Sequence, residues 1–139
     1  MPADVYHLDR FVRAQASVFA DVVSELKAGM KTSHWMWFIF PQIQGLGRSP
    51  VSQEYAISGR EEAKAYLQHP LLGSRLRNCT ELVLQVEGRS ALDIFGSPDD
   101  MKLRSCMTLF AAVSPDDIFQ RALQKYFDGK PDRLTLERL

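Results

Sequence analysis

The sequence MKLRSCMTLFAAV, at residues 101–113, decides the fold class of this chain. Apolar side chains lie on nearly all sides of a helix drawn through it, interrupted by Lys102, Arg104, Ser105 and Thr108. A helix that is hydrophobic all round has to be covered by other elements. We therefore expect residues 101–113 to form the central, buried helix of the domain.

The residues outside this stretch carry helix signals of their own. Apolar residues recur with a helical period at residues 18–26, 71–86 and 118–127, and Gly29, Gly88 and Gly129 follow these segments. Shorter helices are expected at residues 9–14, 51–57, 60–68, 91–95 and 134–139. No run alternates with the period of two that a strand requires. The pattern predicts an all-α fold in a single domain, residues 1–139.

The dipeptide Ser-Pro precedes three of the expected helices, at Ser49-Pro50, Ser97-Pro98 and Ser114-Pro115. Serine is a good N-cap, and proline is tolerated at the first helical position because its missing N–H would have no partner there. We expect each serine to cap a helix. The two Ser-Pro-Asp-Asp strings share little beyond the cap, so they indicate one start signal used twice.

The aromatic run WMWFIF at residues 35–40 is the ambiguous segment. Its aromatic and β-branched residues favour a strand. A lone strand would have no partner, however, and Ser33 and Pro41 bracket a short helix. We predict a helix, buried because such a segment would aggregate if exposed.

The composition excludes several classes of function. Lys+Arg and Asp+Glu both number 17 in 139 residues, so the basic surplus of a phosphate-backbone binder is absent and no nucleic-acid partner is expected. The N-terminus lacks the features of a signal peptide, and the longest apolar run is too short to cross a membrane. Cys79 and Cys106 are expected to be buried thiols. The expected location is the cytoplasm, with no membrane partner; nothing in the sequence defines an oligomeric state.

A candidate ligand site runs from the aromatic segment through a glycine loop to Pro50. In one interpretation, Trp35 and Trp37 fill the core and the glycines only form a turn. In the other, Gly45 and Gly47 let backbone N–H groups approach an anion, Arg48 supplies positive charge, and an aromatic face stacks a ring.

Further candidates lie on either side of this loop. His34 is a candidate acid or base near neutral pH, although a histidine beside tryptophan is more often structural. Glu54 and Tyr55 follow the loop by about two helical turns. In one interpretation they face the same cavity; in the other, Glu54 is solvated and Tyr55 belongs to the core. Lys102, with Ser105 and Thr108, forms a polar strip that is either a cavity wall or a narrow solvent face. The three histidines are too scattered for a metal site, and no cofactor or hydrolase motif is present.

The string HWMWFIFPQ at residues 34–42, with Gly45-Leu46-Gly47-x-Ser49, resembles the signature of an uncharacterised bacterial family. This is a domain-of-unknown-function family whose members are sometimes mislabelled calpastatin. The resemblance continues at residues 52–57, 65–70, 94–96, 100–103, 105–110 and 129–132, the last of these as Gly129-x-x-Asp132. It implies a mainly α-helical fold and no established activity.

A second, more limited resemblance involves PVSQEY at residues 50–55, which is similar to the Pro-Thr-Ser-Glu-His-Tyr motif of the NADAR (YbiA-like) proteins. Those are helical N-glycosidases acting on ADP-ribose-type or related ribosyl-phosphate compounds. This chain has Gln53 where that motif has Glu. Glu54 would have to substitute, and it projects about 100° away around a helix.

Three hypotheses follow from the sequence. The first is a binding protein or enzyme for a nucleotide-like, phosphorylated small molecule, with N-glycoside hydrolysis as its chemistry; the second is a protein–protein interaction module; the third is an aromatic cluster that is only core. For the first, the predicted substrate-binding residues are Trp35, Trp37, Gln42, Gly45, Gly47, Arg48, Ser52, Tyr55 and Lys102, and the predicted catalytic residues are Glu54 and His34. No cofactor is expected. A cavity requires Arg48 and Lys102 to converge with an exposed tryptophan edge, an interface requires a convex apolar patch, and a plain core requires both indoles buried.

Overall fold

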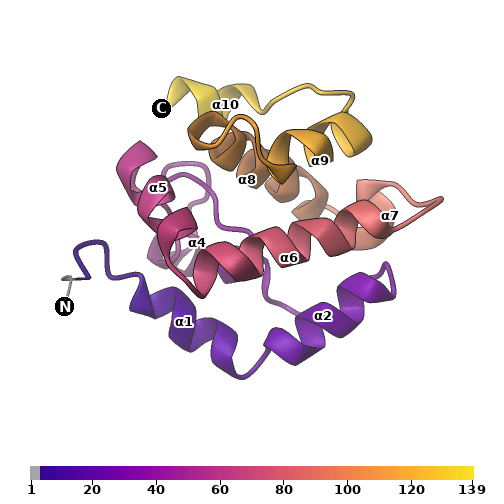
Figure 1. The fold of residues 1–139 in the computed structure, drawn as a ribbon, viewed down its shortest axis with the longest axis horizontal. Helices are drawn as coiled ribbons and strands as arrows, with labels where there is room; N and C mark the ends of the chain where they lie inside the picture. The colour runs from indigo at the N-terminus through magenta and orange to yellow at the C-terminus, as the bar shows by residue number, and fades with distance from the viewer. Residues whose placement is uncertain (1–3) are drawn as a thin grey trace.

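A computed structural model describes residues 4–139, and helices account for all of the regular elements in that range (Figure 1). They are α1 (Asp9–Ala16), α2 (Phe19–Lys27), α3 (Met36–Ile39), α4 (Pro50–Glu54), α5 (Arg60–Gln68), α6 (Leu72–Gln85), α7 (Ala91–Phe95), α8 (Asp99–Val113), α9 (Ile118–Phe127) and α10 (Arg133–Glu137). Within residues 4–139, extended backbone pairs at one place, an isolated parallel bridge between Ile43 and Ile57. The all-α prediction is confirmed.

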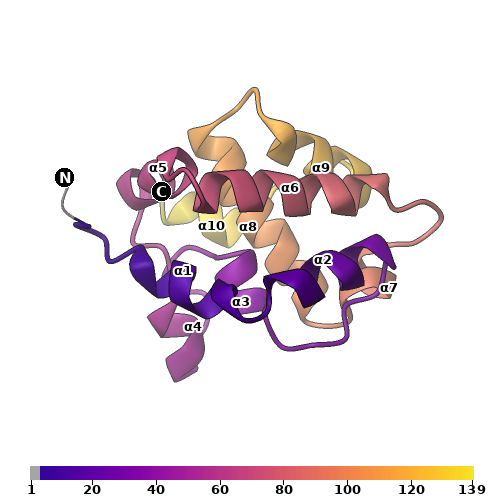
Figure 2. The same cartoon turned by 60° about the horizontal axis from the view of Figure 1, so that its bottom comes forward.

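Helix α8 is the central helix, as its composition predicts. Residues 105–111 are all buried, and α8 packs against α5, α7, α9 and α10. Figure 1 shows the long helix α6 crossing the middle of the molecule, with α1 and α2 on one side and α8, α9 and α10 on the other. In Figure 2, α6 again lies between α9 and the pair α1 and α2. The two sides are therefore joined through α6 and through the segment that contains α3 and α4.

A chain of aromatic rings runs through the core and ties four helices together. Phe11 of α1 meets Tyr66 of α5 edge-on at 5.1 Å between ring centroids. Tyr66 contacts Phe110 of α8 at 5.5 Å, and Phe110 contacts Phe119 of α9 at 5.6 Å. Such pairs stabilise a fold beyond the area they bury. Burial also raises the pKa of the Tyr66 hydroxyl, whose oxygen accepts a hydrogen bond from Gln15.

The aromatic run forms the short helix α3, so the prediction of a helix is confirmed and that of its cap is wrong. Ser33 does not cap it; the Ser33 hydroxyl donates to Oε2 of Glu25 on α2 at 2.7 Å. Four N–H and O–H groups of residues 32–35 donate to this one carboxylate. The segment is therefore held by a tertiary contact instead of a local cap.

Of the three predicted serine caps, one is confirmed and two are wrong. Ser49 caps α4 by accepting from the backbone N–H of Ser52, as expected. Ser97 and Ser114 do not cap: α8 begins after Pro98 without a side-chain cap, and α9 is capped by Asp117. Because Ser114 ends α8 and its hydroxyl donates to Asp117 instead, the Ser-Pro pattern marks the approach to these helices and not their first turn.

Several helix boundaries differ from the sequence prediction, and at α4 and α6 the reason is that backbone groups find other partners. Helix α4 ends at Glu54, since Ile57 leaves the helix to bond the aromatic segment: its N–H donates to the Gln42 carbonyl, and its carbonyl accepts from Gln44, both at 2.8 Å. Helix α6 starts at Leu72 beside His69, whose Nδ1 accepts from the N–H groups of Leu71 and Leu72.

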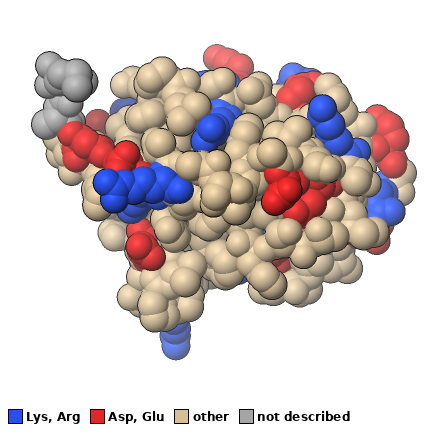
Figure 3. Space-filling model, turned by 90° about the horizontal axis from the view of Figure 1, so that it is seen from below, with Lys and Arg blue, Asp and Glu red and all other residues tan. Residues whose placement is uncertain are grey.

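The surface shown in Figure 3 carries charges of both signs, and both cysteines lie in the core. The face seen in Figure 3 carries acidic and basic side chains interspersed among neutral ones, without a continuous basic patch on that face. Cys79 and Cys106 are buried and free, as expected, and burial raises the pKa of the Cys79 thiol to about 12. Among the helices of residues 4–139, none combines the length and apolar character needed to cross a bilayer.

Candidate functional site

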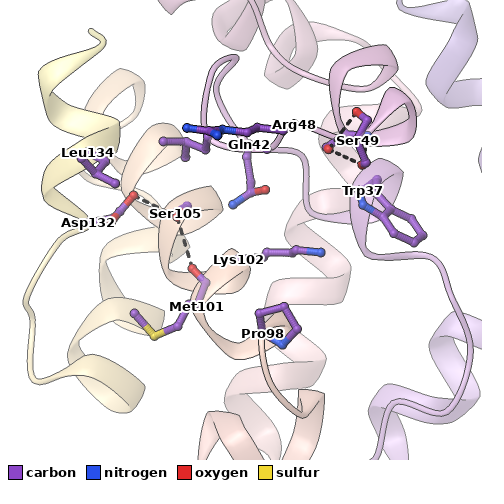
Figure 4. Close-up of a pocket in the computed structure, with 13 residues that line it drawn as sticks. Trp37, Gln42, Arg48, Ser49, Pro98, Met101, Lys102, Ser105, Asp132 and Leu134 are labelled. Carbon is purple, nitrogen blue, oxygen red and sulfur yellow. Dashed lines mark hydrogen bonds between the residues drawn. The ribbon is translucent and has the colours of Figure 1, made fainter.

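A cavity of about 480 Å³ lies where the α3–α4 region meets α8 and α10 (Figure 4). This volume is within the range of small-molecule sites. The residues that line it are Trp37, Gln42, Leu46, Gly47, Arg48, Ser49, Ser52, Pro98, Met101, Lys102, Ser105, Asp132 and Leu134. The aromatic segment, the central helix and the C-terminal helix thus each supply one part of the wall.

Lys102 lies on the α8 wall and extends toward Trp37 (Figure 4). Its Nζ is 5.2 Å from the centroid of the Trp37 ring and 3.3 Å from Oδ1 of Asp99. The other oxygen of Asp99 pairs with Lys31 at 2.9 Å, so one carboxylate is shared by two ammonium groups. Lys102 therefore keeps an excess of positive charge and unused N–H donors beside an aromatic face.

Arg48 and Gln42 project from the loop that closes the cavity on the opposite side (Figure 4). Within residues 4–139, the side chain of neither makes a hydrogen bond, and Arg48 has no ion pair with a carboxylate. The indole N–H of Trp37 is also without an acceptor in this range. Polar groups lining a cavity without internal partners remain free for water or a ligand.

Asp132 brings a carboxylate to the wall and connects α10 to α8. Its Oδ2 accepts from the Ser105 hydroxyl at 2.9 Å and from the N–H and hydroxyl of Thr135, which makes Asp132 the N-cap of α10. Its backbone N–H donates to Thr108 Oγ1 at 2.8 Å. The polar strip of α8 thus has two uses: Lys102 and Ser105 line the cavity, while Thr108 anchors the segment before α10.

The loop of residues 44–49, which we call the glycine strap, has a backbone that side chains would obstruct. Gly45 has φ +94°, and a Cβ there would lie 2.2 Å from Nη1 of Arg138. A Cβ on Gly47 would lie 2.6 Å from the Ser52 side chain. The positive φ of Gly45 and the close approach of Ser52 to Gly47 explain the two glycines of the Gly-Leu-Gly motif.

Backbone donors of the glycine strap are unused. From residue 45 to residue 49, no backbone N–H donates to another atom of the described protein. A small hollow beside the glycine strap includes Gly45, Ser52 and Tyr55. Tyr55 packs against Phe38 with 5.4 Å between ring centroids, and burial raises the pKa of its hydroxyl.

Six of the predicted binding residues line the cavity, namely Trp37, Gln42, Gly47, Arg48, Ser52 and Lys102. Gly45 and Tyr55 line the adjoining small hollow, and Trp35, His34 and Glu54 line neither space. Trp35 is 1% exposed and its indole N–H donates to Glu25, so it is core, as the alternative interpretation of that residue predicts. His34 and Glu54 are exposed and do not line the cavity. Glu54 ends α4, and Arg10 binds its carbonyl at 2.8 Å from the other side. His34 and Glu54 therefore do not face the space where a ligand would bind.

Asp132 is the charged residue of the cavity lining that the site prediction missed. It is far from the other candidates in sequence and reaches them only because α10 folds back onto α8. The sequence signal for it is the motif Gly129-x-x-Asp132, because an acidic residue in a family motif is expected to have a functional role or to cap a helix. Asp132 caps α10.

Comparison with known proteins assigns the chain to a family. Residues 5–139 match the family described as "Protein of unknown function (DUF1810)", and the chain belongs to that family. Among solved structures, it is similar to the conserved hypothetical protein Rv1873 from Mycobacterium tuberculosis, at 56% identity, with 98% of each chain covered and a TM-score of 0.96. No curated protein matches the chain.

Proposed function

We propose that this protein binds a phosphorylated, nucleotide-like small molecule in the cavity between the glycine strap and α8. The observation that carries the proposal is a set of polar donors around one ligand-sized space, beside the face of Trp37. The Arg48 guanidinium and the Gln42 amide have no partner within residues 4–139, and the Lys102 ammonium shares its carboxylate partner, Asp99, with Lys31. Cationic groups whose charge is not fully neutralised by carboxylates favour an anionic ligand.

The roles of these groups follow from their chemistry. The guanidinium of Arg48 binds phosphate oxygens through two N–H groups at once, whereas Lys102 contributes a point charge. Trp37 contacts the ring of the ligand, and Gln42 offers both a donor and an acceptor to its polar edge. The interaction-module alternative lacks comparable support, because most of the aromatic segment is buried and does not form a convex apolar patch.

For chemistry on such a ligand, we propose hydrolysis of an N-glycosidic bond, with Asp132 in place of Glu54. A carboxylate has to activate the attacking water, and it must lie within hydrogen-bond reach of it. Asp132 lines the cavity, and its hydrogen bonds to Ser105 and Thr135 engage only Oδ2. Oδ1 is therefore the oxygen that would accept the proton.

The test of binding is thermal stability of the protein in the presence of AMP, ADP, ribose 5-phosphate, ADP-ribose and inorganic phosphate. A ligand at about 100 times its Kd stabilises by about 2.7 kcal/mol, which raises the Tm by several degrees for a domain of this size. Arg48→Ala should abolish the shift while leaving the Tm of the free protein nearly unchanged, because Arg48 is exposed and unpaired within residues 4–139. Arg121→Ala on α9 is the matched control, since Arg121 is exposed and does not line the cavity.

Two outcomes count against the proposal. One is a panel with no shift for any phosphorylated compound. The other is a shift that survives Arg48→Ala unchanged. For the hydrolytic step, release of the free base from ADP-ribose-type compounds should stop in Asp132→Asn, which keeps an oxygen to cap α10 while removing the carboxylate.

A further inference from the structure

A second hollow of about 350 Å³ lies against the glycine strap and is lined by Gln44, Gly45, Gly47, Gln53, Ala56 and Arg138. It shares Gly47 with the main cavity. We propose that this hollow is a second anion subsite and that the ligand is a nucleoside diphosphate whose two phosphates bind along the glycine strap. This inference rests on the proposed function of the main cavity.

Arg138 provides the charge of the second hollow. Its guanidinium lies directly on the backbone of Gly45, so close that a Cβ there would lie 2.2 Å from Nη1 and 2.5 Å from Cζ. No side chain or carbonyl of residues 4–139 accepts a hydrogen bond from this guanidinium, and it forms no ion pair with a carboxylate in that range. The exposed guanidinium thus lies beside the glycine strap with its donors free within residues 4–139.

The remaining polar side chains of this hollow are already used to shape the glycine strap. The Gln44 amide donates to the Ser58 carbonyl at 3.2 Å, and the Gln53 amide donates to the Arg48 carbonyl at 3.1 Å. No acidic residue lines the hollow. A site with a free guanidinium and no carboxylate selects anions, since the guanidinium is permanently charged.

The glycine strap itself connects the two subsites. Its unused backbone N–H groups, residues 45–49, lie between Arg138 on one side and Arg48 on the other. Successive free N–H groups bind phosphate oxygens without contributing a side chain that would block the ligand. Two phosphates joined by a bridging oxygen match two neighbouring subsites that share the wall at Gly47. The nucleoside then extends toward Trp37 in the larger cavity.

The experiment compares AMP with ADP, which differ by one phosphate, using isothermal titration calorimetry on the full chain. We expect the wild type to bind ADP at least tenfold more tightly than AMP. Arg138→Ala should remove that preference while changing the affinity for AMP less than twofold. Arg138→Lys, which keeps the charge, should retain part of the preference. Arg48→Ala should weaken both nucleotides, and Arg121→Ala should weaken neither.

The outcomes separate the two proposals. Equal affinity for AMP and ADP in the wild type, or an ADP preference that survives Arg138→Ala, overturns the second subsite and leaves the main cavity standing. Absence of binding by either nucleotide overturns the nucleoside diphosphate as ligand, and the main cavity falls with it only if ribose 5-phosphate, ADP-ribose and phosphate also give no thermal shift. The melting temperature of each variant without ligand shows whether a lost preference reflects the site or the fold.

Discussion

Glu25 on α2 offers the sharpest test of how the aromatic segment is held. Its Oε1 accepts from the N–H groups of Thr32 and Ser33 at 2.7 and 2.9 Å and from the indole N–H of Trp35 at 3.0 Å. Its Oε2 accepts from the Ser33 hydroxyl at 2.7 Å. We predict that Glu25→Gln destabilises the protein by about 1.5–2 kcal/mol at pH 7 and that this cost disappears in acid.

The magnitude follows from the pKa of the carboxyl group. Burial acts to raise the pKa of Glu25, but the four hydrogen bonds outweigh it and lower the pKa from 4.5 to about 2. At 1.36 kcal/mol per unit, such a shift corresponds to about 3.4 kcal/mol. Glu25 is partly exposed, and solvent screening reduces that figure to roughly half.

The sign of the pH dependence is set by the direction of this shift. Because the folded-state pKa is depressed, the stabilisation is fully present above about pH 4.5 and is lost as the pH falls toward about 2. The difference in unfolding free energy between wild type and Glu25→Gln should therefore be constant from pH 7 to 5 and shrink below that.

The assay is urea unfolding of both proteins at several pH values from 7 to 3, followed by far-UV circular dichroism. Glu61→Gln on α5 is the control, since the Glu61 side chain is 76% exposed and makes only a helix-surface pair with Lys64. A Glu25→Gln cost below about 0.5 kcal/mol at pH 7, or a cost that does not change between pH 5 and 3, would refute the reasoning.

Three further predictions test the packing. Gly73→Ala should destabilise by more than about 2 kcal/mol in urea unfolding, because a Cβ there would lie 2.1 Å from a carbonyl oxygen of α5; a cost under 0.5 kcal/mol would contradict the close approach. Glu62→Ala should cost about 3–5 kcal/mol, since it leaves Arg10, which pairs with Glu62 at 2.8 Å, largely buried without its carboxylate; a neutral result in the same assay would count against the pair. In single-tryptophan proteins, iodide should quench the emission of Trp37 and spare that of Trp35, so equal quenching would contradict the assignment of one indole to the cavity and the other to the core.

The helical architecture could be predicted because its signals are local. The period of apolar residues places helices α5 and α7 at their observed bounds, residues 60–68 and 91–95, and identifies α8 as the buried centre. The dipeptide Ser-Pro alone could not show that Ser97 and Ser114 do not cap their helices. Asp117 competes for the second cap, and its side chain lies closer to the helix start.

The candidate site was predictable only in part, for a similar reason. Arg48, Gly47 and Lys102 carry local signals: a charged residue in a glycine loop and a lysine on an apolar helix. Arg138 carries none and Asp132 has only its place in the motif Gly129-x-x-Asp132, because each reaches the glycine strap or the cavity through the way α10 folds over α8. The role of Glu54 could not be settled by spacing, since the helix on which it was expected, to residue 57, ends at Glu54 itself.

By itself, the sequence determined that the chain is all-α, that residues 101–113 form its buried centre, and that residues 45–47 form a glycine loop. These properties depend on residue types over a few turns of chain, where periodicity and backbone sterics act. The tertiary structure alone decided which tryptophan is core and which faces the cavity, and that Asp132 and Arg138 join a loop about 90 residues earlier. Those outcomes depend on long-range packing, in which Glu25 binds one indole and the C-terminal helix closes over α8.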